Sequence, residues 1–253
     1  MVDLPSTLEA TVPNQLSDET GVASAVAFLA LTIPITIVLN LAASLAAVSA
    51  VGSDAGETLI FIAGSIATEL SFLLVGIGYV SFRSSFQVPI QVPDRDAIPA
   101  LIGGLGMSFA TAFLSLVSTD AVLPSVELSP GFMQYTNLAA PTGVGLVIAA
   151  VLSLALIGPV EEFFFRGVIQ QRLRASFSAR IAIGTAGLVF ALFHVYPVLL
   201  LSPPIAAVAH MTLYYSVMGG IFGWVFERTN TFVAPALVHG VFNAVIFVVP
   251  LLT

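Results

Sequence analysis

The chain has 253 residues, of which 58% are hydrophobic and 8% are charged, and its mean hydropathy is +1.05. Soluble domains carry roughly one-quarter charged residues, so this composition excludes an ordinary soluble protein and predicts an integral membrane protein. The chain has no cysteine, which excludes disulfides and thiol nucleophiles, and its net charge of -7 comes from fourteen acidic residues and seven arginines without any lysine. A chain this acidic gives no reason to expect a nucleic-acid partner.

Residues 1–20 are polar and acidic, and they lack the basic segment of a secretion signal, so we expect a short solvated tail. The remainder contains seven apolar runs long enough to cross a bilayer, which needs about 20 helical residues. These runs do not alternate apolar and polar residues as barrel strands do. We therefore expect an all-α, polytopic transmembrane helical bundle that forms one domain over residues 21–253. The expected spans are 22–50, 58–82, 98–123, 143–166, 181–200, 204–226 and 231–251.

The first run is long enough to tilt or to contain a break at Pro34 or Asn40, so the expectation is seven to eight spans. The arginines predict the orientation. All of them follow spans two, four and six, and the connections after spans one, three and five contain none. Because loops rich in arginine stay in the cytoplasm, we expect a multi-pass protein of the cell membrane with its arginine-bearing loops on the cytoplasmic side. These residues are Arg83, Arg95, Arg166, Arg172, Arg174, Arg180 and Arg228.

Ionisable and amide side chains inside the apolar runs are the candidate functional residues. A carboxylate or imidazole at bilayer depth costs several kcal/mol, so such groups usually face the interior of the bundle and often mark a site. They are Glu69 in the second span, Glu161, Glu162 and Arg166 in the fourth, His194 in the fifth, His210 in the sixth, and His239 with Asn243 in the seventh.

Helical spacing indicates which of these groups share a face. Glu162 and Arg166 are four residues apart and can form a buried ion pair that locks the fourth span. His239 and Asn243 are one turn apart, so they share a face of the helix. As an alternative to catalysis, their side chains could form hydrogen bonds to neighbouring helices. Glu161 is turned by about 100° from Glu162, so the two acids need not have the same role.

Depth in the membrane groups the same residues independently. Counted at 1.5 Å per residue from the cytoplasmic ends of the spans, Glu161, His194, His239 and Asn243 all lie about 10–20 Å below the inner surface. One pocket could hold all four, with Phe190 packed one turn before His194. Three helices that deliver an acid, two imidazoles and an amide to one depth favour catalysis over packing.

Two other polar residues are interpreted as structural. His210 enters near the opposite surface, where it is expected to be hydrogen-bonded beside Tyr214. Glu69 is expected to bind another helix or to face a wet crevice.

Three sequence motifs carry a family resemblance. EEFFFR at 161–166 resembles the EExxxR signature of the CPBP family, FALFH at 190–194 the FxxxH signature, and HGVFN at 239–243 the HxxxN signature. This family comprises the CAAX-prenyl endopeptidases and the abortive-infection-type intramembrane proteases. The motifs occur in the family's order within residues 159–243, and they are specific only as a set. In the first three spans the match rests on hydropathy alone.

The resemblance implies an eight-helix intramembrane protease whose catalytic pocket opens toward the cytoplasm and the lipid. By motif position it implies Glu161 as the general base, His194 as its partner in holding the water, and His239 with Asn243 as the groups that face the oxyanion. It implies supporting roles for Glu162 and Arg166. This is consistent with hydrolysis that uses an activated water instead of a serine or cysteine nucleophile.

The resemblance and the residues leave a metal as an open alternative. Glu161, His194 and His239 are a permissible zinc set, since two imidazoles and a carboxylate leave one position for water. No HExxH sequence is present, and the resemblance is compatible with a water activated by glutamate alone. We therefore favour a reaction without a metal cofactor.

The expected partners are the lipid bilayer and a substrate that is a prenylated CAAX-like tail, a leader peptide or a membrane protein. The sequence does not indicate an oligomeric state. Two alternatives from other classes are a non-proteolytic scaffold or immunity protein of the same fold, and a small transporter. An inverted repeat of broken helices would favour transport, and none is visible in the sequence.

Overall fold

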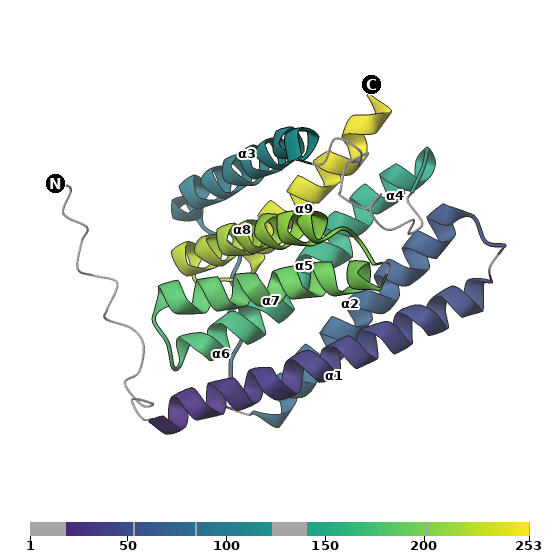
Figure 1. The fold of residues 1–253 in the computed structure, drawn as a ribbon. Coiled ribbons are helices and arrows are strands. Elements are labelled where there is room, and N and C mark those ends of the chain that lie inside the picture. The colour runs from purple at the N-terminus through teal and green to yellow at the C-terminus, as the bar shows by residue number, and fades with distance from the viewer. Residues whose placement is uncertain (1–18, 53, 84, 123–140, 201, 253) are drawn as a thin grey trace.

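The computed structural model describes residues 19–52, 54–83, 85–122, 141–200 and 202–252, and within these ranges it contains helices and no strands (Figure 1). The predicted all-α class is therefore confirmed. The helices are α1 (Glu19–Val51), α2 (Glu57–Phe82), α3 (Ile98–Val122), α4 (Val144–Leu152), α5 (Gly158–Glu162), α6 (Gln171–Arg174), α7 (Ala179–Leu199), α8 (Ile205–Thr229) and α9 (Val233–Val248). The described residues also contain two 3₁₀ turns, η2 (Arg95–Ala97) and η6 (Val249–Leu251), and two π-helical segments, η4 (Ser153–Ile157) and η5 (Phe163–Gln170).

Seven helical segments within the described ranges are long and apolar enough to cross a membrane. α1 continues through Pro34 and Asn40 without a break, so the described residues contain seven spans, and the eighth helix that the family resemblance implied is not found among them. The expected acidic tail lies outside the described residues except for Glu19 and Thr20, which begin α1.

The fourth span differs from its expected bounds, because it runs over Val144–Arg174 and not over 143–166. It combines α4, η4, α5, η5 and α6, and the two π-helical segments lie on either side of Glu161 and Glu162. Such segments insert an extra residue into a helical turn and often occur at functional sites. In this span they rotate the residues on each side of the two acids relative to a regular helix.

This extension corrects the placement of Arg172 and Arg174, which lie in the helix and not in a loop. Arg166, already expected in this span, and Arg172 are buried with 0% and 4% exposure. Arg172 donates a hydrogen bond of 2.7 Å to the Ser24 hydroxyl of α1. A buried arginine is held by contacts inside the bundle and does not indicate which side of the membrane a loop lies on. The predicted orientation therefore depends on the arginines that are not buried. These are Arg83, Arg95, Arg174, Arg180 and Arg228.

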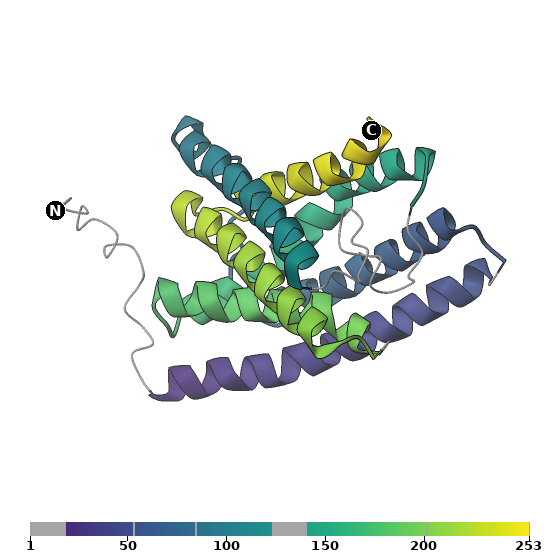
Figure 2. The same cartoon turned by 45° about the horizontal axis from the view of Figure 1, so that its top comes forward.

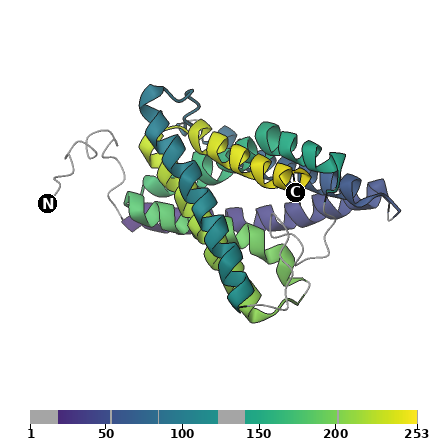
Figure 3. The same ribbon diagram turned by 90° about the horizontal axis from the view of Figure 1, so that it is seen from above.

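The helices pack as neighbouring pairs. α1 lies beside α2, α7 lies along α8, and α3 packs on α8 and α9 (Figures 1 and 2). Seen from above, α3 and α8 cross steeply over the remaining helices (Figure 3). Large apolar side chains stay exposed on the outside of the bundle, for example Leu74, Phe113 and Leu188. A surface of this kind suits lipid and not water.

Hydrogen bonds gather the turns at one end of the bundle. The Thr231 hydroxyl, after α8, donates to the Gln91 carbonyl, which lies before α3, at 2.7 Å. The Ser176 hydroxyl, after α6, donates to the Gly21 carbonyl of α1 at 2.9 Å. The beginning of α1 and the connections after α2, α6 and α8 therefore lie at the same end, where the five remaining arginines are also found.

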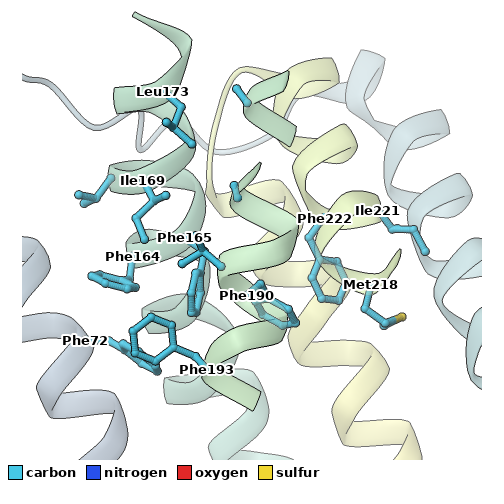
Figure 4. Packing of buried hydrophobic residues seen from close by; sticks show 14 of the residues in the cluster. Phe72, Phe164, Phe165, Ile169, Leu173, Phe190, Phe193, Met218, Ile221 and Phe222 are labelled. Atoms are coloured by element: carbon cyan, nitrogen blue, oxygen red, sulfur yellow. The ribbon is translucent and has the colours of Figure 1, made fainter. Parts of the chain in front are cut away.

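Phenylalanine rings form the centre of the core (Figure 4). Phe72 of α2 lies 5.0 Å from Phe164 and 5.3 Å from Phe165, measured between ring centroids, and 5.2 Å from Phe193 of α7. Phe164 and Phe165 are fully buried. The residues directly after Glu161 and Glu162 thus anchor the fourth span between α2 and α7.

Two glycines let the fourth span approach α9 closely. A Cβ added at Gly158 would lie 2.9 Å from the Ala236 carbonyl oxygen, and one added at Gly240 would lie 2.9 Å from the Ser153 carbonyl oxygen. Small residues allow backbones to meet in this way in membrane bundles. Gly240 directly follows His239, so this contact sets the distance between His239 and the fourth span.

We predict that Gly240→Ala destabilises the protein, because the new methyl group overlaps a backbone carbonyl. The expected loss is about 1–3 kcal/mol, which corresponds to a lowering of the thermal midpoint by roughly 2–10 °C. Gly184→Ala in α7 is the matched control, since a Cβ there meets no atom within 4 Å. Thermal unfolding of the two purified variants in detergent tests this, and equal midpoints would contradict it.

Candidate active site

Glu161 and His194 lie next to each other in the middle of the bundle. The Glu161 Oε2 atom is 3.8 Å from the Nε2 atom of His194. This distance is too long for a direct hydrogen bond. The Glu161 side chain is buried, and its Oε2 atom has no hydrogen-bond partner among the described residues. A buried carboxylate oxygen without a partner is unusual and leaves an acceptor available.

A backbone contact fixes the tautomer of His194. Its Nδ1 atom is 2.9 Å from the carbonyl oxygen of Phe190, one turn earlier in α7. A carbonyl oxygen only accepts, so Nδ1 carries the hydrogen and Nε2 of the neutral ring presents a lone pair toward Glu161. The Phe190 ring packs on the imidazole with 4.2 Å between ring centroids, as the sequence spacing predicted.

Glu162 holds the second histidine. Its Oε1 atom is 3.0 Å from the Nδ1 atom of His239, which donates this hydrogen bond to the carboxylate. Its Oε2 atom is 3.1 Å from the Nε atom of Arg166, so the predicted ion pair is present. That second contact is electrostatic, because its angles are not those of a hydrogen bond. The sequence spacing indicated the ion pair but not the bond to His239.

Arg166 is fully buried and connects the site to α8. Its NH2 group donates a hydrogen bond of 3.0 Å to the Gly219 carbonyl. Its guanidinium carbon lies 4.9 Å from the ring centroid of Phe190 and 5.6 Å from that of Phe222. Phe222 in turn stacks on His239, with 4.6 Å between centroids and 19° between ring planes. Glu162 and Phe222 therefore contact the His239 ring directly, and Arg166 contacts both of these residues.

Asn243 lies one turn after His239 on α9 and is half-buried. Its amide forms no hydrogen bond with any residue that the structure describes, so it is available to a bound molecule. His239 is close enough to Glu161 for the two groups to interact electrostatically. The structure thus brings Glu161, His194 and His239 together, and it places Asn243 beside His239 without a contact to the other two.

The structure adds two residues that sequence reasoning did not assign to the site. Glu69 of α2 is 2% exposed and interacts electrostatically with Glu161, so it lies beside the site and not at a remote helix contact. Tyr215 of α8 stacks on the imidazole of His194. Neither belongs to a motif. The only available signal for Glu69 was its position inside an apolar span, and Tyr215 gave none.

His210 belongs to a different cluster. Its Nε2 atom lies 2.8 Å from the Ser115 hydroxyl and 2.9 Å from the Thr119 hydroxyl, both on α3. These hydrogen bonds join α8 to α3, which agrees with the interpretation of His210 as a structural residue.

The proposed metal ligands do not fit a metal ion as they are placed. Among the described residues, no group of three His, Cys, Asp or Glu side chains is arranged to hold one. Glu161 and His194 each offer an acceptor toward the other. The Nδ1 atom of His239 donates to Glu162, which leaves a lone pair on Nε2 of the neutral ring.

One comparison with known proteins gives a match. Residues 143–245 match the family model described as type II CAAX prenyl endopeptidase Rce1-like. No curated protein and no solved structure matches the chain significantly. The matched segment runs from the start of the fourth span into α9 and includes all three motifs together with the contacts among Glu161, Glu162, His194 and His239. Residues 143–245, less than half of the chain, are thus similar to the type II CAAX prenyl endopeptidase Rce1-like family, and this match supports the resemblance to the CPBP family of intramembrane proteases.

Proposed function

We propose that the chain hydrolyses a peptide bond with a water that Glu161 and His194 activate inside the membrane. The observation that carries this proposal is the 3.8 Å separation between the Glu161 carboxylate and the Nε2 atom of His194. Both atoms are acceptors when His194 is neutral. A water within about 2.8–3.0 Å of each could donate one hydrogen to Glu161 and the other to His194, which would direct its lone pairs at a substrate carbonyl.

Glu161 acts as the proton carrier in the proposed reaction. The water oxygen attacks the carbonyl carbon while one water proton moves to the Glu161 carboxylate, and the carbonyl oxygen becomes an oxyanion. When the tetrahedral intermediate collapses, the C–N bond breaks and the proton on Glu161 passes to the leaving nitrogen. The products are a carboxylic acid and an amine, and Glu161 returns to its starting state.

Asn243 and His239 are the proposed donors to the oxyanion. The Asn243 amide offers an N–H donor regardless of protonation state. His239 already donates its Nδ1 hydrogen to Glu162, so it can offer an Nε2 hydrogen only when both ring nitrogens are protonated. Asn243 is therefore assigned the larger share of this stabilisation, with His239 held beside it by Glu162 and Arg166.

The proposed substrate is a peptide that reaches the site within the membrane. A prenylated CAAX-like tail is the first candidate, since the matched family is described by that substrate class. A leader peptide or a segment of another membrane protein fits the same chemistry. A panel of fluorogenic peptides with and without a prenyl group separates these candidates.

Substitution of Glu161 tests the assignment of the base. Glu161→Gln keeps the shape of the side chain but removes the acceptor that takes the proton, so kcat should fall by about 10²–10⁴-fold. Asn243→Ala should lower kcat by about 10²–10³-fold. Glu57→Gln at the exposed start of α2 is the control and should leave peptide cleavage unchanged. Full activity of the Glu161→Gln protein would refute the proposed base.

Metal removal is a separate test of the chemistry. Because the described donors are not arranged around an ion, cleavage should persist after dialysis against a strong chelator. The measurement is the rate of peptide cleavage before dialysis, after dialysis and after addition of Zn²⁺. Loss of activity on dialysis together with recovery on zinc addition would reverse this expectation.

The proposed site opens toward the cytoplasm, at the end of the bundle that carries the arginines. Thiol labelling of introduced cysteines tests this orientation of the bundle in the membrane. The chain has no cysteine, so single-cysteine variants can be made directly. In intact cells, a membrane-impermeant thiol reagent should label Thr142→Cys but not Ser178→Cys, since the two exposed positions lie at opposite ends of the bundle. Labelling of Ser178→Cys from outside would invert the proposed orientation.

A further inference from the structure

The His194 ring contacts two aromatic rings from different helices. Phe190, on its own helix, covers one side at 4.2 Å between centroids, with 34° between the ring planes. Tyr215 of α8 stacks on the imidazole at 4.3 Å and 28°. The Phe190 and Tyr215 centroids are 6.4 Å apart, which is too close for rings on opposite faces of the imidazole, so the two rings contact adjoining sides of it. Tyr215 lies within the matched segment but outside all three motifs.

The other contacts of His194 do not fix its ring by themselves. The ring has one hydrogen bond, from Nδ1 to the Phe190 carbonyl, and that partner is on the same helix. The distance of 3.8 Å to Glu161 is too long to orient the ring directly. The side chain of His194 is also 24% exposed, so part of its surface is open. The ring of Tyr215, which comes from a second helix, is therefore the contact that fixes the orientation of the His194 ring relative to the other helices.

Close packing between α7 and α8 holds Tyr215 at this distance. Gly219, one turn after Tyr215, meets Gly187 of α7 so closely that an added Cβ would lie 2.8 Å from the Gly187 Cα atom. The same Gly219 carbonyl accepts the hydrogen bond from Arg166. Tyr214 packs edge-on against Tyr215 at 5.0 Å between centroids. The separation between the Tyr215 ring and His194 is thus set by backbone contact and not by flexible side chains.

We propose that Tyr215 is a positioning residue that holds the imidazole of His194 in the orientation required toward Glu161. This inference rests on the proposed function, since it assigns Tyr215 to the same water-activating pair. The face of the aromatic ring carries the effect. Any planar ring at this position should therefore suffice, and the phenol hydroxyl should contribute little.

Four variants separate the ring from the hydroxyl and from general stability. Tyr215→Phe keeps the ring, while Tyr215→Leu and Tyr215→Met remove it with different shapes, so that one ringless variant remains if the other does not fold. Tyr196→Phe is the matched control, because it also deletes a phenol hydroxyl. That hydroxyl donates 2.8 Å to Asn40 of α1, away from the pair. The control should have a lower thermal midpoint and an unchanged kcat.

Steady-state cleavage of a peptide substrate is the first readout. Tyr215→Phe should retain kcat within about twofold, and the ringless variants should lose about 10–100-fold in kcat, the size expected for a catalytic group misplaced by up to 1 Å. Their KM should change by less than about threefold. A ringless variant with wild-type kcat overturns the inference. A loss in Tyr215→Phe as large as that in Tyr215→Leu overturns it as well, because the hydroxyl would then carry the effect.

The second readout does not need a substrate. The chain has three histidines, so the imidazole signals of labelled protein can be assigned by substituting each one. The Tyr215 ring stacked on His194 should shift the carbon-bound protons of the imidazole upfield. Removal of the Tyr215 ring should move these signals, and Tyr215→Phe should leave them in place. Unmoved signals in both ringless variants overturn the inference.

The two readouts distinguish the failure of this inference from the failure of the proposed function. If Glu161→Gln abolishes cleavage while the ringless variants cleave normally, the base is supported and the role of Tyr215 is wrong. If Glu161→Gln cleaves normally, the proposed function fails, and the ring-proton shifts alone still decide whether Tyr215 orients His194.

Discussion

The arrangement of the site depends on the buried carboxylate of Glu162. It lies between Arg166 on its own helix and His239 on α9, and no part of it is exposed. An isolated charge at this depth would cost several kcal/mol, and removing one partner of a buried pair typically costs about 3–5 kcal/mol. Substitution of any one of Glu162, Arg166 and His239 is therefore expected to destabilise the contacts of the other two. Arg166 also donates a hydrogen bond to the α8 backbone. Through its two partners, the Glu162 carboxylate therefore connects the fourth span to α8 and α9.

Glycine contacts make these polar bonds geometrically possible. Gly158 and Gly240 let the fourth span and α9 meet at backbone distance, and Gly187 and Gly219 do the same for α7 and α8. A side chain at any of these positions would separate the helices and lengthen the bonds made beside it. Close backbone contacts at glycines and buried polar contacts thus hold the helices together. Both are expected in a membrane, because lipid provides no hydrophobic driving force between helices.

The sequence allowed the class, the spans and the motif residues to be predicted, because they depend on local patterns. Apolar run length gave seven spans, and four-residue spacing gave both the Glu162–Arg166 pair and the Phe190–His194 stack. The bond from His239 to Glu162 and the stack of Tyr215 on His194 join helices far apart in the chain, and no periodicity encodes them. The predicted end of the fourth span was wrong because its last turn contains Arg172 and Arg174, which composition assigns to a loop although both lie in the helix and packing buries Arg172.

Adjacent glutamates with opposite environments explain why both are present. Glu162 is fully enclosed, and its two oxygens face an imidazole at 3.0 Å and a guanidinium at 3.1 Å. Glu161, turned by about 100° around the helix, faces His194 at a distance that leaves an oxygen without a partner among the described residues. A single helical turn thus presents one carboxylate that stabilises the helices and one that remains free to accept a proton. Exchanging their roles would require rotating the span, which the buried rings of Phe164 and Phe165 prevent.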